Sequence, residues 1–350
     1  MNENVDNLGL VYHPDYLIHT QAHHPERKER LESVLSAIGQ QNLDDRLQMF
    51  EPLPAAVEDL ALIHDRNYIS SVEEACLSGR LSLDMDTYLV PESYKIALLS
   101  AGGALTGLRR VMDKNPGKVF VLNRPPGHHA ESDRAMGFCL FNNIAVAAAV
   151  AKRDYSLKRI AIVDWDVHHG NGTQHSFERD AEVLFISTHQ SPAYPGTGSA
   201  GEVGRSDGEG YTVNIPMPPG CGDVEYGMFF SEIIVPVLDQ FKPEILLISA
   251  GQDAYHMDPL ASMSLTYKGY YNMAAELARV AERWSDGRIL LCLEGGYHLE
   301  GQAGAVIHVL NALGGWNLPI DEKAPELKPS DSANRRLEEI RLIQKNYWKL

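Results

Sequence analysis

Two aspartates and two histidines follow one short apolar segment near the middle of the chain. Residues 160–163 are predicted to form a buried strand, and Asp164, Asp166, His168 and His169 come directly after it. Side chains alternate along an extended segment, so Asp164, Asp166 and His168 are expected to project to the same side. Carboxylate oxygens and imidazole nitrogens suit zinc, and three such ligands leave a position open for water. The spacing alone leaves open which of these residues bind metal, and an ordinary polar turn remains an alternative.

Other predicted strands also end in residues that could do chemistry. The pair His128-His129 follows residues 119–122 and a rigid Pro-Pro-Gly turn, Asp253 follows residues 245–249, and Tyr297 follows residues 289–293. In open parallel sheets ligands bind at the carboxyl ends of the strands. We therefore expect these side chains to share one site, with Asp253 as the candidate for a third metal ligand.

The elements that must position this site alternate between strands and helices. This alternation predicts an α/β fold with a mainly parallel sheet flanked by helices on both faces. Strands are expected at residues 8–12, 119–122, 160–163, 183–187, 211–215, 245–249 and 289–293, and helices at 26–38, 57–77, 93–112, 144–153, 173–177, 226–241, 266–284, 303–313 and 333–349. We expect one catalytic domain over 1–315, and a connector with a C-terminal amphipathic helix over 316–350 that packs on the body.

Composition indicates which ligands and which cellular compartment to expect. The chain has 350 residues and a formal net charge of −16, which disfavours nucleic acid and favours cationic ligands. Residues 1–8 do not resemble a secretory signal, and no apolar run approaches the roughly 20 residues that span a membrane, so we expect a cytoplasmic protein.

The four cysteines are widely spaced, which argues against a thiolate zinc site. The N-terminal histidines lack ligand spacing and are interpreted as loop residues: His13, His19, His23 and His24.

Five motifs occur in a fixed order along the chain. They are RPPGHHA with GFCLFNN, DWDVHHGNGTQ, SPAYPGTG, SAGQDAYHMDPL and LEGGY. Together they resemble the zinc-dependent histone deacetylase superfamily, closest to its class II members and the bacterial histone deacetylase-like amidohydrolases. The resemblance covers residues 8–314 and implies an arginase-like α/β fold.

The resemblance implies a role for each residue of the predicted site. It assigns one zinc ion to Asp166, His168 and Asp253. His129 is then the general base, oriented by Asn171, and Tyr297 donates a hydrogen bond to the developing oxyanion. His128 acts electrostatically beside Asp164 and is expected to be more readily protonated than His129, because an asparagine cannot stabilise an imidazolium by charge.

The resemblance also implies a substrate channel and two structural potassium sites. The channel residues are Gly137, Phe138, Tyr194 and Leu260. The inner potassium site is assigned to Asp164, Asp166, His168 and Ser187, and the outer one to Phe177, Asp180, Val183 and Tyr211. One departure from the family is Gln252, which stands beside a zinc ligand where a large apolar residue is common.

The implied activity is hydrolysis of acetyl or other acyl groups from the ε-amine of lysine in a protein or peptide. An acetylpolyamine, a small acetylated amine, is the alternative substrate, although the apolar Leu260 stands where polyamine-selective relatives have an acidic residue. Two other classes are a two-manganese ureohydrolase and a catalytically silent reader of acyl-lysine. Retention of the whole set of predicted catalytic residues argues against the silent reader. A homo-oligomer is possible.

Overall fold

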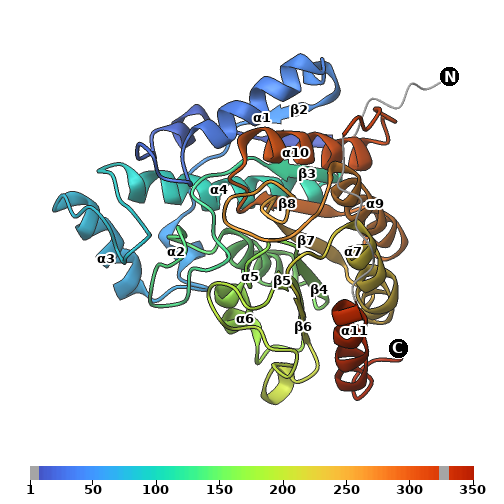
Figure 1. The fold of residues 1–350 in the computed structure, drawn as a ribbon. Helices are drawn as coiled ribbons and strands as arrows, with labels where there is room; N and C mark the ends of the chain where they lie inside the picture. The colour runs from blue at the N-terminus through green and yellow to red at the C-terminus, as the bar shows by residue number, and fades with distance from the viewer. Residues whose placement is uncertain (1–7, 323–330) are drawn as a thin grey trace.

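The computed structural model describes residues 8–322 and 331–350, and its strands form one sheet (Figure 1). The eight strands lie in the order β2-β1-β3-β8-β7-β4-β5-β6, and every neighbouring pair is parallel. Their bounds are β1 Leu8–Val11, β2 Gln48–Phe50, β3 Lys118–Val121, β4 Ile160–Asp164, β5 Val183–Gln190, β6 Thr212–Met217, β7 Ile245–Ala250 and β8 Ile289–Leu293. The predicted α/β fold is confirmed, and the sheet is parallel throughout.

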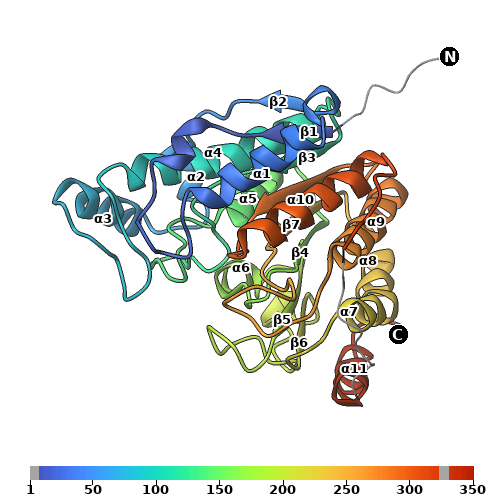
Figure 2. The same ribbon diagram turned by 45° about the horizontal axis from the view of Figure 1, so that its top comes forward.

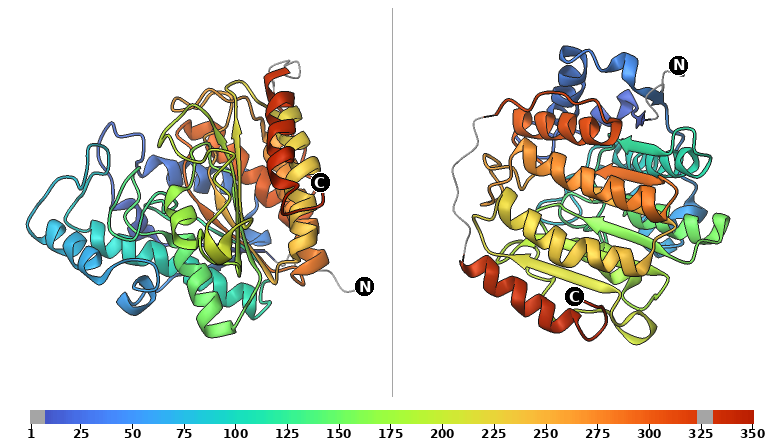
Figure 3. Two further views of the ribbon diagram at one scale, coloured as in Figure 1. Left: turned by 90° about the horizontal axis from the view of Figure 1, so that it is seen from below. Right: turned by 90° about the vertical axis from the view of Figure 1, so that its right-hand side faces the viewer.

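Helices cover both faces of the sheet (Figures 2 and 3). They are α1 Glu29–Gln40, α2 Val57–Leu60, α3 Arg66–Leu77, α4 Ser93–Met112, α5 Asn143–Tyr155, α6 Asn171–Phe177, α7 Asp223–Phe229, α8 Val235–Phe241, α9 Tyr267–Trp284, α10 Leu299–Gly314 and α11 Asp331–Gln344. Helices α3, α4 and α5 contribute to one apolar core, and α1 and α7 to α11 contribute to the other.

Strand β4 shows why the sequence of this sheet is continuously apolar. Ala161 and Val163 belong to the core under α9 and α10, whereas Ile160 and Ile162 belong to the core under α4 and α5. A strand buried on both faces has no polar side to alternate with. The polar residues therefore begin where β4 ends, at Asp164.

Two predicted helices are interrupted. The helix expected over 57–77 is divided into α2 and α3, because the N–H of Asp65 donates to the carbonyl of Ser132 at 2.8 Å instead of continuing the helical bonding. Buried His64 anchors the same link: its Nδ1 lies 2.8 Å from the carbonyl of Glu131, and its Nε2 accepts from the N–H of Asn142. The helix expected over 226–241 contains a π-helical turn, Phe230–Ile234, just before Pro236. Proline lacks the N–H that would continue the regular helical bonding. The short edge strand β2 was not predicted.

The C-terminal helix α11 lies against β6 and the core beside it. Ala333, Leu337 and Ile340 are buried on one face of the helix. After the helix, the indole N–H of Trp348 donates to the carbonyl of Gly210 at 3.0 Å. Part of the predicted connector, residues 323–330, lies outside the described residues, as do residues 1–7.

Candidate active site

The loops after β3, β4, β7 and β8 meet at the centre of the sheet. In chain order β3 precedes β4, but in the sheet β8 and β7 lie between them. The side chains that follow these four strands therefore gather at one edge, where ligands bind in open parallel sheets. The predicted convergence of the polar clusters is what the topology produces.

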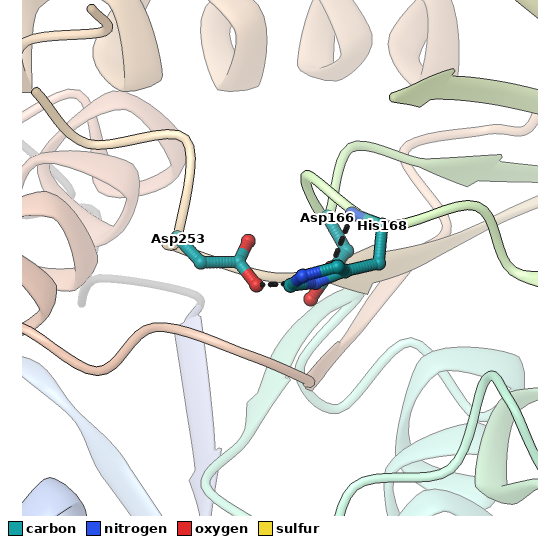
Figure 4. A group of neighbouring side chains, drawn as sticks. All are labelled: Asp166, His168 and Asp253. Carbon is teal, nitrogen blue, oxygen red and sulfur yellow. Dashed lines mark hydrogen bonds and ion pairs between the residues drawn. The ribbon is translucent and has the colours of Figure 1, made fainter. Parts of the chain in front are cut away.

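Asp166, His168 and Asp253 form the one group of at least three candidate metal-binding side chains found among residues 8–322 and 331–350. Their ligand atoms lie within 4.8 Å of one another, and Nδ1 of His168 is 3.1 Å from both Oδ1 of Asp166 and Oδ2 of Asp253 (Figure 4). Asp166 and His168 lie together on the loop after β4, and Asp253 reaches toward them from the loop after β7 (Figure 4). Two carboxylates and one imidazole are a donor set that fits a divalent metal with an open position.

Backbone groups hold the two carboxylates in place. Asp166 accepts the N–H of Gly295 through Oδ2 at 2.8 Å, and Asp253 accepts the N–H of Val167 through Oδ1 at 2.9 Å. A Cβ on Gly295 would lie 2.2 Å from Oδ2 of Asp253, so no larger residue fits there. These partners leave Oδ1 of Asp166 and Oδ2 of Asp253 directed at His168, which orients the ligand set as outer-shell groups do in metal sites.

Asp164 is separate from this group. Its Oδ2 lies 2.9 Å from Nδ1 of His128, and its Oδ1 accepts the N–H of Asp166 at 3.1 Å. The alternation of side chains therefore does not bring Asp164, Asp166 and His168 to one metal. Asp164 instead faces His128, the pairing that the family resemblance implied.

The two adjacent histidines differ in basicity. Burial opposes the charged form of His128, but Asp164 and Asp166 outweigh it and raise its pKa to about 10. Burial, the charge of His128 and that of His168 hold the pKa of His129 well below its usual value. Nδ1 of His129 lies 2.8 Å from Oδ1 of Asn171. This pair is therefore arranged as one cation beside one neutral base, with His128 the more readily protonated, as expected.

Tyr297 follows β8 and faces the same pocket. Its N–H donates to Oδ2 of Asp258 at 2.6 Å, which fixes the backbone of the loop. Burial raises the pKa of the Tyr297 phenol well above its usual value, with nearby Asp253 and Asp166 adding to the shift and Arg30 opposing it. The hydroxyl is therefore kept protonated and able to donate a hydrogen bond.

A pocket of about 250 Å³ leads to these groups. Phe138 and Tyr194 form its aromatic walls: the ring of Phe138 packs edge-on to Tyr297, and that of Tyr194 packs edge-on to His129. The pocket is lined by Asp86, His129, Gly137, Phe138, His168, Tyr194, Leu260 and Tyr297. Gly137 has φ +57° and lies against the His129 ring, where a Cβ would come within 2.3 Å of Cδ2. All four predicted channel residues line this pocket.

The residues assigned to potassium lie on and around β4 and β5. Ser187 is the register partner of Asp164 across β4 and β5. The N–H of Asp180 donates to the carbonyl of Phe177 at 2.9 Å, and the carbonyl of Tyr211 accepts the N–H of Phe185 at 2.9 Å. Each assigned set is thus contiguous, the first at the end of β4 and the second at the start of β5.

Gln252 lies buried beside the metal group. Its amide donates to the carbonyl of Ala250 at 3.0 Å, and its Cβ packs against Gly296. It therefore contacts the loop before Tyr297.

Sequence reasoning missed several buried charges that support the site. Arg30 donates to the carbonyls of Gly296 and Glu294, at 2.7 and 2.5 Å. Glu294 accepts the N–H groups of Gly127 and His128 through its carboxylate. Two N-terminal histidines interpreted as loop residues are also packed: His19 is buried against Tyr88, and the ring of His24 contacts Phe138. Only Glu294 carried a signal in the sequence, because it belongs to the LEGGY motif, three residues before Tyr297.

Comparison with known proteins agrees with this geometry. Residues 24–313 match the histone deacetylase domain family. The chain belongs to this family. A probable deacetylase from Archaeoglobus fulgidus is 41% identical over 97% of this chain and 98% of that protein. A histone deacetylase-like amidohydrolase from Pseudomonas aeruginosa is 40% identical, covering 83% of this chain and 75% of that protein.

A solved member of the histone deacetylase family has the same fold. The crystal structure of the HDA15 HD domain superposes with a TM-score of 0.90 at 33% identity, covering 98% of this chain and 96% of that chain. Membership in the family supports a hydrolytic deacetylase and a metal-dependent site.

Among the helices of residues 8–322 and 331–350, none combines the length and apolarity needed to cross a membrane.

Proposed function

We propose that this chain is a zinc-dependent amidohydrolase that removes acetyl or other acyl groups from the ε-amine of lysine in proteins or peptides. The proposal rests on three groups that line one pocket. His168 is a candidate metal ligand, His129 is a neutral imidazole, and Tyr297 is a protonated phenol. Hydrolysis of an amide needs these three functions on one reacting group.

Asp166, His168 and Asp253 would hold one zinc ion. When bound by these residues, zinc would supply Lewis-acid chemistry, polarising an amide carbonyl and lowering the pKa of water. Potassium ions at the inner and outer residue sets would stabilise the end of β4 and the start of β5 without taking part in the chemistry. The single three-residue group in the described parts of the chain favours this zinc chemistry over a two-manganese ureohydrolase, which needs further bridging ligands.

His129, Tyr297 and His128 have separate roles in the reaction. His129 takes a proton from the attacking water, and its lowered pKa makes the resulting imidazolium a ready donor to the leaving amine. Tyr297 donates its hydroxyl to the carbonyl oxygen as that oxygen becomes negative. His128, charged beside Asp164, supplies a fixed positive charge. The products are a carboxylate and a free amine.

The walls of the pocket favour acyl-lysine as the substrate class. Phe138 and Tyr194 present aromatic faces to an extended aliphatic chain. Leu260 lines the same pocket and is partly exposed, and it offers no charge to the second amine of a polyamine. We accordingly propose an acyl-lysine protein or peptide as the partner. The cytoplasmic location and the absence of nucleic-acid binding stay predictions from the sequence.

The test is a panel of acyl-lysine peptides and acetylspermidine, assayed with zinc-reconstituted protein and with Tyr297→Phe as the control. We expect turnover of acetyl-lysine peptide that falls about a hundredfold or more in the control. A strong preference for acetylspermidine would replace the lysine assignment by the polyamine one. Inactivity of the zinc-loaded protein on the whole panel would instead favour a silent acyl-lysine reader.

A further inference from the structure

A carboxylate lies beyond the asparagine that contacts His129. Glu131 is buried, and its Oε1 accepts the side-chain N–H of Asn171 at 2.7 Å. Asn171 in turn places Oδ1 2.8 Å from Nδ1 of His129. The three side chains therefore form a chain of hydrogen bonds that ends on a charged group.

The surroundings of the Asn171 amide determine which way it points. Its Nδ2 has three neighbours that only accept: Oε1 of Glu131, the carbonyl of His129 at 3.3 Å, and the sulfur of Met136 at 3.3 Å. An amide turned by 180° would direct its oxygen at a carboxylate and a carbonyl, and those contacts are repulsive. The NH2 group must face Glu131, so the oxygen must face His129.

Glu131 is itself held as an anion. Its Oε2 accepts from Arg134 at 2.7 Å, and its Oε1 lies 3.1 Å from Nδ1 of His175. Burial opposes ionisation of Glu131, but the hydrogen bonds from Arg134 and Asn171 outweigh it and lower the pKa of the carboxyl. An ionised carboxylate is a stronger acceptor than a neutral oxygen, so it holds the amide firmly.

We propose that Glu131 is a positioning residue for His129: by fixing the Asn171 amide, it keeps the hydrogen of the imidazole on Nδ1 and leaves Nε2 free to accept a proton. An amide oxygen opposite Nδ1 requires that nitrogen to be the donor. The opposite amide orientation would place the hydrogen on Nε2, and the imidazole would then be unable to act as a base. The inference rests on the proposed hydrolase function, in which His129 takes the proton from water.

The kinetic test is a double-mutant cycle between Glu131→Ala and Asn171→Asp. With Asn171 present, Glu131→Ala should lower kcat about 10- to 100-fold, the usual effect of losing an outer-shell partner, with KM nearly unchanged. A carboxylate at 171 cannot present a donor to His129, but it would repel Glu131 in the single Asn171→Asp variant. In that background, Glu131→Ala should therefore leave kcat unchanged or raise it. An equal loss in both backgrounds would show that Glu131 only stabilises its loop, and would overturn the proposal.

Two further variants test whether the effect comes from the acceptor oxygen of Glu131 rather than from its charge or from folding of the loop. Glu131→Gln keeps the size and can still accept from Asn171, so it should retain most of the activity that Glu131→Ala loses. Asp133→Asn alters an exposed carboxylate of the same loop and should behave as wild type. A Glu131→Gln variant as inactive as Glu131→Ala would contradict the acceptor role.

A spectroscopic readout makes the test independent of the substrate. Long-range proton–nitrogen NMR spectra of histidine-labelled, metal-free protein report which ring nitrogen of each histidine carries the hydrogen, and a His129→Phe variant assigns the relevant signals. We expect His129 to be protonated on Nδ1 in wild type and to lose this preference in Glu131→Ala. An unchanged tautomer would overturn the proposal, whereas inactivity of the wild type on every acyl substrate would contradict only the proposed function.

Discussion

The guanidinium of Arg30 lies over the ring of Tyr297, with its central carbon 4.9 Å from the ring centroid. The same guanidinium donates to the carbonyl of Gly296 and pairs with Glu26 at 3.0 Å. A residue of the first long helix therefore fixes a loop that comes 266 residues later in the chain. The position of the Tyr297 hydroxyl depends on this buried cation.

Arg30→Met should impair both the fold and the reaction. The change leaves Glu26 with one cation fewer and leaves loop carbonyls without a donor, which we expect to lower the free energy of unfolding by about 3 kcal/mol. Because the Tyr297 loop is released, kcat should fall about tenfold or more in the protein that remains folded. Urea unfolding and kinetics measure the two effects. Arg27→Met, on a partly exposed neighbouring cation, is the matched control; equal effects of both changes would contradict this role.

Asn171→Asp should move the acidic limb of the pH profile. In the wild type the pKa of His129 is held well below 6.5 by burial and by the charge of His128, so activity should persist below pH 6.5. A carboxylate at 171 stabilises the imidazolium and raises that pKa. Activity is then lost at a higher pH as the solution is acidified. The dependence of kcat/KM on pH measures the shift, and an unmoved limb would exclude His129 as the titrating base.

Stability should fall in acid partly through Glu26. Burial opposes its ionisation, but Arg124 and Arg30 outweigh burial and lower its pKa from 4.5 to about 2. The unfolded chain therefore binds a proton before the folded chain does, and stability present above pH 4.5 is lost as the pH falls toward 2. The contribution is on the order of 3 kcal/mol. Urea unfolding at several pH values should show a weaker dependence in Glu26→Gln than in wild type, and an undiminished dependence in Glu29→Gln.

Zinc should stabilise the folded protein through Asp253. A metal that binds only the folded state at about a hundred times its Kd contributes about 2.7 kcal/mol, which corresponds to a Tm rise of several degrees. Asp253→Asn removes one anionic ligand and should abolish most of that rise. Calorimetry with and without zinc tests this, with Asp207→Asn as the exposed control. Equal stabilisation of both variants would place the metal elsewhere.

Leu260→Glu should shift selectivity toward acetylpolyamines. Leu260 lines the pocket and is 42% exposed, so a carboxylate there can attract a second cationic amine without being buried. We expect the ratio of kcat/KM for acetylspermidine to that for acetyl-lysine peptide to rise about tenfold, or about 1.4 kcal/mol. Leu260→Gln supplies a neutral side chain of the same size as the glutamate. A similar shift in that variant would show that shape, not charge, selects the substrate.

The layout of the sheet and the position of the site were predictable from sequence because they depend on local patterns. Continuous apolar segments mark strands buried on both faces, and β3, β4, β7 and β8 are followed by polar residues that a core would not hold. The separation of Asp164 from the metal group was not predictable from alternation. It depends on the turn after β4, where the N–H of Asp166 bonds Oδ1 of Asp164.

The supporting charges were not predictable for a different reason. Arg30 and Glu131 act on groups brought to them by the tertiary fold, and neither stands in a pattern that distinguishes it from an ordinary helix or loop charge. The split of the helix over 57–77 has the same origin, because the N–H of Asp65 bonds to Ser132, which lies far along the chain.

The strand order has a consequence for how this protein is made. Strands β8 and β7 occupy the centre of the sheet between β3 and β4, although they are the last strands in the chain. During synthesis, the N-terminal strands have no partners at the middle of the sheet until residues 245–293 have been made. Such long-range pairing is slow and leaves strand edges exposed to other chains. The sheet therefore stays incomplete, with edges of β3 and β4 unpaired, until the final third of the chain is available.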